Sequence, residues 1–178
     1  MGSARQALII GGTGMLAGCT ERLAEQGWRV ALPSRRPRER QSPGVVAVRA
    51  EWSAPELFAE RVADALSGPV ELLVSWVHTP WREPVLRACE RLLTEAAPTV
   101  EVWASASADP VRNRPEPVLA RRGCHQVLLG FHRMNGRSRW LTNAEISEGV
   151  YLACLAAIAG EEPRVHAVGQ LRPWSARP

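Results

Sequence analysis

The sequence lacks lysine, since all 22 of its basic residues are arginine. It has one tyrosine, Tyr151, so an active site that pairs a tyrosine with a lysine is excluded. There is no run of about 18 apolar residues that could cross a membrane, and the first residues lack the apolar core of a signal peptide. These absences predict a cytoplasmic protein with no membrane partner.

Cysteine and histidine are few, and their spacing does not favour a metal site. The four cysteines are scattered among apolar neighbours with no C-x-x-C pair (Cys19, Cys89, Cys124 and Cys154). This pattern predicts buried free thiols rather than disulfides or metal ligands. The four histidines lack the i, i+4 pairing and the nearby carboxylates of a zinc site. We therefore expect no bound metal.

The net charge of +4 raises the question of a nucleic-acid partner, because basic proteins gain affinity by releasing counterions from phosphates. Only the segment from Arg35 to Arg40 is a dense basic cluster. Elsewhere arginines alternate with glutamates, as at Glu60 and Arg61, which is typical of solvated helix faces. We therefore expect no nucleic-acid partner and a local anion at the cluster.

The most informative segment runs from Ala7 to Gly18, where a short apolar strand leads through glycines into a helix. Glycines permit a tight turn and let backbone N–H groups approach a pyrophosphate, which the helix N-terminus attracts. The spacing is looser than G-x-G-x-x-G, and an ordinary tight turn is the alternative. The candidate contacts with a dinucleotide are Gly11, Gly12, Thr13, Gly14, Met15 and Leu16.

Strand and helix patterns alternate along the chain, which predicts a parallel sheet with helices on both faces. The expected strands are Gln6 to Ile10, Trp28 to Leu32, Val45 to Arg49, Val70 to Val77 and Val100 to Ala104. The expected helices are Gly14 to Gln26, Pro55 to Leu66 and Glu83 to Ala96. The fold class is therefore α/β with a doubly wound parallel sheet, and the 178 residues suit a single domain.

The C-terminal part begins with a β-hairpin signal, Asn135-Gly136, between the extended runs Cys124 to Met134 and Arg137 to Leu141. Before it, the proline- and arginine-rich segment from Ser105 to Gly123 predicts a loop that closes over a ligand.

A capping box at Thr142 and Glu145 starts a helix that we expect to end near Ala159, and a last strand is expected from Val165 to Leu171. Together with the hairpin, the apolar residues of this helix suggest a homodimer surface (Ile146, Val150, Ala153 and Ala157).

In an open parallel sheet the ligand binds at the carboxyl ends of the strands, so the residues after each strand are the candidates for a site. Ser34, Arg35 and Arg36 follow the second expected strand, where an NAD site has an Asp or Glu for the ribose hydroxyls. Two guanidinium groups and a hydroxyl suit the 2′-phosphate of NADPH instead. The alternative is a solvated arginine patch, because Arg38 and Arg40 extend the cluster.

The run Gly-Gly-Thr-Gly-Met-Leu from Gly11 to Leu16 resembles the short-chain dehydrogenase/reductase superfamily, in particular its atypical and extended members. The order of elements from the hairpin to Pro173-Trp174 resembles that of a small group of bacterial proteins that are described only as short-chain dehydrogenases. The resemblance implies a Rossmann-like fold that binds NAD(P). The chain departs from the family's Tyr-x-x-x-Lys motif, because Leu155 is the fourth residue after Tyr151. It also has no room for the long helix that carries this pair.

The resemblance also implies further site residues. Glu51 and Trp52 follow the third expected strand, where related proteins place residues against the adenine. Trp76 and Val77 occupy the family's Asn-Ala-Gly turn along the cofactor, and Gly130 and Phe131 lie where related chains pass the nicotinamide. By position, the serine that orients a substrate carbonyl is Ser105 or Ser107.

His78 is the first candidate for a general acid, because an imidazole near neutral pKa can donate a proton to a developing alkoxide or amine. A hydrogen-bonded structural role is the alternative for a lone histidine at a strand end. His132 and His125 rank lower, and we expect Tyr151 to pack inside the last helix.

Four of the seven tryptophans fall at or just beyond the carboxyl ends of expected strands (Trp52, Trp76, Trp81 and Trp103). They are interpreted either as core filling, which we expect of Trp28, or as an aromatic-walled pocket for a planar or cationic substrate. The resulting prediction is an NADPH-dependent reductase of a small carbonyl or imine. The alternative is an NADP(H)-binding protein without redox turnover, either a sensor or a redox-neutral cyclase or isomerase.

Overall fold

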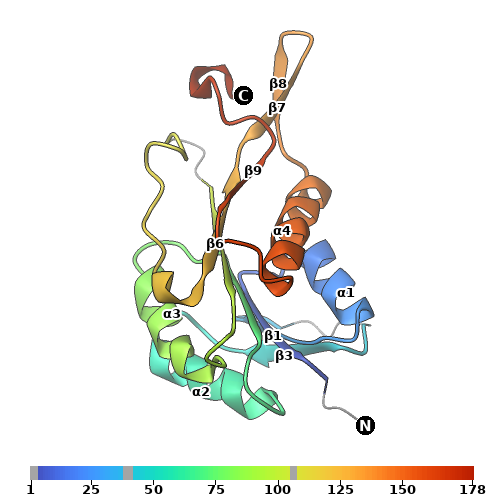
Figure 1. The fold of residues 1–178 in the computed structure, drawn as a ribbon, viewed down its shortest axis with the longest axis vertical. Helices are drawn as coiled ribbons and strands as arrows, with labels where there is room; N and C mark the ends of the chain where they lie inside the picture. Colours follow the sequence, from blue (N-terminus) through green and yellow to red (C-terminus); the bar gives the residue numbers. More distant parts are fainter. Residues whose placement is uncertain (1–3, 38–41, 105–107) are drawn as a thin grey trace.

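A seven-stranded parallel β-sheet forms the centre of the protein, in the strand order β3-β2-β1-β4-β5-β6-β9 (Figure 1). The structure is a computed structural model that describes residues 4–37, 42–104 and 108–178. The strands are β1 (Gln6–Ile10), β2 (Arg29–Ser34), β3 (Val45–Arg49), β4 (Leu72–Ser75), β5 (Thr99–Trp103), β6 (Cys124–Leu129) and β9 (Val165–Val168). The direction of winding reverses between β1 and β4, which is where such sheets form a ligand crevice.

Helices cover both faces of the sheet (Figure 1). Helices α1 (Ala17–Glu25) and α4 (Asn143–Ile158) pack on one face, and α2 (Pro55–Ala65) and α3 (Arg82–Cys89) pack on the other. Successive strand residues point to opposite faces. Ile9 therefore lies in the apolar core under α1 and α4, whereas Leu8 and Ile10 lie in the core under α2 and α3. The predicted doubly wound α/β fold is confirmed.

Two predicted helices are shorter in the structure. The first begins at Ala17 rather than Gly14, because the glycine segment forms turns instead. Helix α3 ends at Cys89 rather than Ala96 and is followed by a short 3-10 helix, Glu90–Leu92. The chain then returns to the sheet, where the Thr94 N–H donates to the Val70 carbonyl.

The predicted capping box is present at the start of α4. The Thr142 hydroxyl accepts from the Glu145 N–H, and the Glu145 carboxylate accepts from the Thr142 N–H. The helix is apolar on most sides, and the four residues expected in a homodimer surface are buried against the sheet and α1 (Ile146, Val150, Ala153 and Ala157). That prediction was wrong for the helix, because these side chains form the core instead.

The predicted hairpin is formed by β7 (Phe131–Met134) and β8 (Arg137–Trp140), which pair antiparallel and project from the body (Figure 1). Asn135 and Gly136 both have positive φ, 53° and 77°, as a two-residue hairpin turn requires. The run expected from Cys124 to Met134 is interrupted at Gly130, where a Cβ would lie 2.0 Å from the Gln170 carbonyl oxygen.

The four cysteines are free and buried, and burial raises the pKa of the Cys89 and Cys124 thiols to about 12. Among the described residues, no helix is long and apolar enough to span a membrane. The same residues contain no cluster of three or more His, Cys, Asp or Glu side chains that could hold a metal ion.

Candidate functional site

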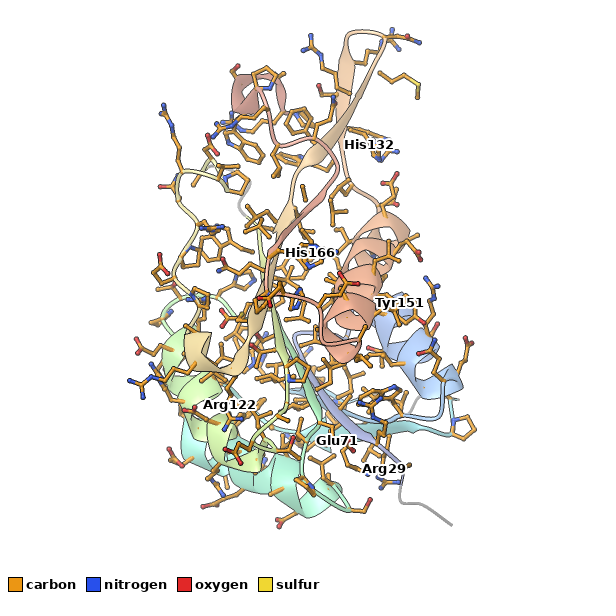
Figure 2. All side chains as sticks on the ribbon, viewed as in Figure 1. Arg29, Glu71, Arg122, His132, Tyr151 and His166 are labelled. Atoms are coloured by element: carbon orange, nitrogen blue, oxygen red, sulfur yellow. The ribbon has the colours of Figure 1, made fainter. Side chains whose placement is uncertain are left out.

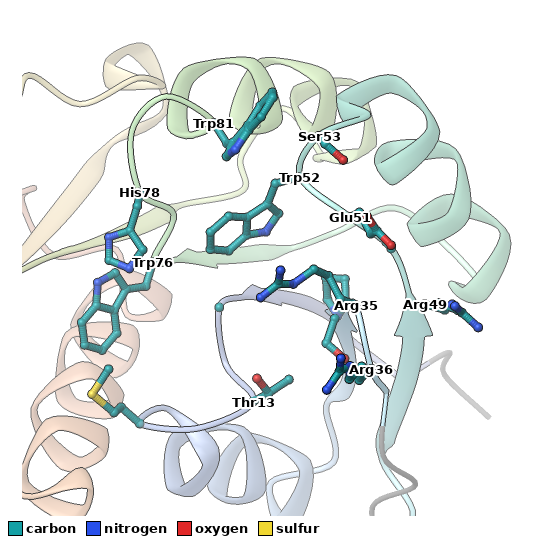
Figure 3. Close-up of a pocket in the computed structure, with 15 residues that line it drawn as sticks. Thr13, Arg35, Arg36, Arg49, Glu51, Trp52, Ser53, Trp76, His78 and Trp81 are labelled. Atoms are coloured by element: carbon teal, nitrogen blue, oxygen red, sulfur yellow. The ribbon is translucent and has the colours of Figure 1, made fainter.

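A cavity of about 1010 Å³ lies at the carboxyl edge of the sheet, where β1, β2, β3 and β4 end (Figure 3). It brings together ten of the residues predicted as site residues: Gly11, Thr13, Met15, Ser34, Arg35, Arg36, Glu51, Trp52, Trp76 and His78. Its lining also includes Trp81, one of the tryptophans interpreted as a pocket wall, and four residues that were not predicted: Pro33, Arg49, Ala50 and Ser53.

The glycines at the end of β1 have different physical roles. Gly11 has a φ of +83°, and a Cβ there would lie 2.3 Å from the Trp76 carbonyl oxygen. A Cβ on Gly12 would lie 2.6 Å from the Ile9 side chain and 2.8 Å from that of Leu32. Gly14 is exposed, and a Cβ on it would meet nothing within 4 Å. Gly11 and Gly12 therefore make the turn possible, whereas the backbone at Gly14 is open to a ligand.

The N-terminus of α1 follows this turn without a side-chain cap and without an acidic residue in its first turn. Such an end leaves backbone N–H groups that an anion can accept from. The Leu16 side chain is fully buried in the core, so this residue can offer a ligand only its backbone. The Ser147 hydroxyl donates to the Met15 carbonyl at 2.7 Å, which fixes the turn against α4.

The end of β2 supplies a hydroxyl and two guanidinium groups. Arg35 and Arg36 are exposed and make no ion pair within the described part of the chain. Figure 3 shows Arg35 reaching into the cavity below Trp52, whereas Arg49, which pairs with Ser34 across β2 and β3, points away from it. The Ser34 hydroxyl oxygen is buried and has no hydrogen-bond partner among the described residues. Glu51 is also in the lining at this end, and with Arg35, Arg36 and Arg49 the end carries a net positive charge.

The opposite end of the cavity is aromatic (Figure 3). The His78 ring centroid lies 6.3 Å from that of Trp52 and 6.4 Å from that of Trp76. His78 is exposed, Trp76 is buried, and Trp81 is 37% exposed at the start of α3. The interpretation of these tryptophans as a pocket wall agrees with the position of Trp52, Trp76 and Trp81 in the cavity lining.

Several predicted site residues do not line the cavity. Val77 is buried in the core on the α2–α3 side. Phe131 is fully buried, its N–H donates to the Gln170 carbonyl, and its carbonyl accepts from the Gln170 N–H. The strand edge at Gly130 and Phe131 is thus occupied by the C-terminal segment rather than open to a nicotinamide. Ser105 and Ser107 lie outside the described residues.

The other candidate proton donors are not among the residues that line the cavity, and Figure 2 shows His132 at the hairpin and Tyr151 on α4. His132 contacts the Glu145 carboxylate at 2.9 Å at the base of the hairpin. The Tyr151 hydroxyl accepts from the Gln26 amide at the α1–α4 interface. His125 is buried, and its Nδ1 lies 2.8 Å from Nε2 of His166. Burial lowers the pKa of both of these imidazoles.

One buried ion pair near the cavity was not predicted. Glu101, on β5, is 3% exposed, and its carboxylate accepts from the Arg82 guanidinium and from the Val118 N–H. Arg82 begins α3 directly after Trp81 and also donates to the Glu116 carbonyl at 3.0 Å. The pair therefore ties the aromatic wall to the loop after β5. Its signal in the sequence is one acidic residue between two buried valines, Val100 and Val102.

No protein-family model and no curated protein sequence matches the chain. A short-chain dehydrogenase/reductase from Serratia marcescens superposes with a TM-score of 0.64 and 14% identity, covering 93% of this chain and 95% of that one. A 3-oxoacyl-[acyl-carrier protein] reductase from Brucella melitensis, solved in complex with NAD, gives 0.66 and 16%, covering 95% and 97%.

A third solved structure, a protein from Thermus thermophilus, gives a TM-score of 0.68 with 20% identity and covers 93% of this chain and 97% of that one. Because identities of this size establish shared architecture alone, the comparison concerns the fold. The chain therefore has the Rossmann fold of the short-chain dehydrogenase/reductase structures.

Proposed function

We propose that the protein binds NADP(H) in the cavity at the carboxyl edge and acts as an NADPH-dependent reductase of a small carbonyl or imine. The observation that carries the proposal is that one cavity joins the glycine turn, the Ser34-Arg35-Arg36 segment and the aromatic wall. The resemblance in fold to short-chain reductases supports it, and the Brucella melitensis enzyme was solved with NAD.

The residues at the end of β2 fit a phosphorylated ribose. Arg35 and Arg36 make no ion pair among the described residues, and guanidinium groups bind phosphate with paired, charge-assisted hydrogen bonds. β2 ends in Ser34 and is followed by two arginines, so the acidic residue of an NAD site is missing there. The unpartnered Ser34 hydroxyl agrees with a ligand oxygen at this position. We therefore assign NADP(H) rather than NAD(H).

Adenine would lie against Glu51 and Trp52, and the phosphates against the glycine turn and the first turn of α1. When bound, NADPH supplies a hydride. The protein then has to orient the substrate and provide a proton, and His78 is the titratable side chain at the aromatic end of the cavity. An iminium substrate already carries its proton, so its reduction depends less on a strong acid, and the indole faces suit a cation.

A second candidate function is NADP(H) binding without redox turnover, in a sensor or a redox-neutral enzyme. A specific observation favours it: the backbone of Phe131, expected beside the nicotinamide, is hydrogen-bonded to Gln170 instead. The sequence has no lysine and therefore no Tyr-x-x-x-Lys motif, which also favours a protein without redox turnover.

The two functions are separated by measuring NADPH oxidation with a panel of aldehydes, ketones and cyclic imines. The reductase proposal predicts turnover with at least one compound. It also predicts that His78→Asn lowers kcat by roughly 10²–10⁴-fold on a carbonyl substrate while the dissociation constant of NADPH changes little. His132→Asn is the matched control, since His132 lies outside the cavity. Tight NADPH binding without turnover of any compound would support the second candidate.

A further inference from the structure

The β7–β8 hairpin stands out from the body, and the C-terminal segment packs along it as far as Ser138, which leaves the exposed turn segment from Arg133 to Arg137 as the outer half (Figure 1). At the base, the Trp174 ring lies 5.9 Å from that of Phe131 and 6.1 Å from that of Trp140. The Ser138 hydroxyl donates to the Ala176 carbonyl. A two-stranded sheet is marginally stable by itself in water, so an uncovered outer half is a feature that needs a physical reason.

The outer half of the hairpin carries two arginines whose charge is not compensated. Arg133 and Arg137 are exposed, and their side chains have no hydrogen bond or ion pair within the described residues. Met134, which pairs with Arg137 across the strands, is 75% exposed. By contrast, Arg139 at the base is paired with Glu145. The outer half therefore presents two free cations around an exposed apolar side chain.

Helix α2 presents a complementary surface. Glu56, Glu60 and Asp64 follow the i, i+4, i+8 spacing of one helix face and are all exposed. None of the three has an ion-pair partner in the part of the chain that the structure describes. Leu57, beside this carboxylate row, is 45% exposed. Arg61, one turn after Leu57, is also exposed and donates to the Arg49 carbonyl, so the three carboxylates leave this surface of α2 with a net negative charge beside an exposed apolar side chain.

The hairpin and α2 lie at opposite ends of the long axis of the molecule (Figure 1). A two-fold axis perpendicular to this long axis turns a second copy end for end, so that each hairpin reaches the end of its partner that carries α2. Such an isologous arrangement makes the contact twice and closes the assembly. We propose that the protein forms an antiparallel homodimer in which Arg133 and Arg137 of each copy bind the carboxylate row of α2 in the other.

The charge distribution favours a second copy over a nucleic acid. Affinity for nucleic acid grows with the number of phosphates neutralised, and two unpaired arginines on the outer hairpin neutralise few. The same chain supplies carboxylates that lack partners. Exposed ion pairs contribute only about 0.2–1 kcal/mol each and are screened by salt, so the dimer is expected to be weak and salt-sensitive.

The test is sedimentation velocity of the full chain over a concentration series, at about 50 mM and about 500 mM NaCl. We expect a dimer at low salt that dissociates at high salt. Arg133→Glu/Arg137→Glu should raise the dimer dissociation constant at least about tenfold, because the hairpin then repels α2. Arg91→Glu/Arg121→Glu is the matched control: it changes the charge equally at two exposed arginines of other elements.

A mixing experiment excludes misfolding as the cause. Glu56→Arg/Glu60→Arg should also be monomeric alone, whereas an equimolar mixture of it with Arg133→Glu/Arg137→Glu should dimerise, since both contacts are again complementary. A wild-type protein that stays monomeric at low salt, or a dimer that both double variants leave intact, overturns the proposal. So does a labelled single-stranded oligonucleotide that binds monomeric wild-type protein through Arg133 and Arg137, which identifies the partner as nucleic acid.

Discussion

Glu101 is a charged residue inside the sheet, and its environment explains why the charge is tolerated. Its side chain is 4% exposed and that of Arg82 is 15% exposed, so each ion is desolvated and depends on the other. Breaking a buried ion pair by removing one partner leaves an uncompensated charge, at a cost of about 3–5 kcal/mol. The Val118 N–H also donates to the Glu101 carboxylate, and this hydrogen bond would be weaker with a neutral acceptor.

We therefore expect Glu101→Gln to lower the free energy of unfolding, measured by urea denaturation, by about 3 kcal/mol or more. Glu71→Gln is the control, because it removes the exposed Arg5–Glu71 pair and should cost less than about 1 kcal/mol. Equal losses in the two variants would show that the Arg82–Glu101 pair does not stabilise the fold.

The paired imidazoles of His125 and His166 make stability depend on pH. Burial lowers the pKa of both, and the neighbouring His125 lowers that of His166 further. The folded protein therefore holds them neutral, while the unfolded chain takes up protons below about pH 6.5, so the free energy of unfolding falls as pH decreases below that value.

Denaturant unfolding at a series of pH values between about 7 and 5 tests this linkage. His125→Gln/His166→Gln should show a shallower decline than the wild type, even if its stability is lower at every pH. An unchanged slope in the double variant would contradict the linkage.

At the scale of elements, helix α4 holds the glycine turn in place, because Ser147 on its first turns hydrogen-bonds to Met15. Its start is fixed by the Thr142 capping box. Thr142→Ala should lower the free energy of unfolding by about 1 kcal/mol, measured by thermal and urea denaturation. Asn143→Ala, at the next and exposed position, is the control and should be close to neutral. A neutral Thr142→Ala would mean that packing alone sets where α4 begins.

The elements that the sequence predicted best are those that local pattern controls. Apolar runs identified β1 and β3, and Asn135-Gly136 identified the hairpin because both positions need positive φ. The element boundaries that were predicted wrongly are set by residues that are distant in the sequence. Helix α3 ends early because Thr94 bonds to Val70, and the strand after β6 breaks at Gly130 because Gln170 of the C-terminal segment lies against it.

In the candidate site, too, the residues placed by local pattern were predicted and those placed by tertiary contacts were not. Parallel strands bring their carboxyl ends to one edge, so reading the residues after each strand was enough to place Arg35, Trp52 and His78 around one cavity. The expectation for Phe131 depended on where the C-terminal segment would lie, which no local pattern specifies. The Arg82–Glu101 pair was missed because its two members are joined only by tertiary packing.

At the scale of the whole molecule, the cavity and the proposed dimer contacts use different parts of the surface. The carboxyl edge carries the cavity with its arginines and aromatic wall, whereas the hairpin and α2 occupy the two ends of the long axis (Figure 1). Binding at the cavity and association through the hairpin therefore use different residues. Each proposal can fail without the other, and variants of one surface serve as controls for the other.

The most direct test of the central claim is a titration of the protein with NADPH and with NADH, followed by quenching of tryptophan fluorescence. Trp52, Trp76 and Trp81 line the cavity and should report binding. We predict a preference for NADPH that Arg35→Ala/Arg36→Ala reduces by about tenfold or more, since a hydrogen bond to a charged group contributes about 1.5–3 kcal/mol.

Arg133→Ala/Arg137→Ala, on the hairpin and outside the cavity lining, is the matched control and should leave both affinities unchanged. Equal binding of NADPH and NADH, or a preference that survives Arg35→Ala/Arg36→Ala, would contradict the assignment of the phosphate site. Failure to bind either nucleotide would contradict the account of the cavity as a dinucleotide site.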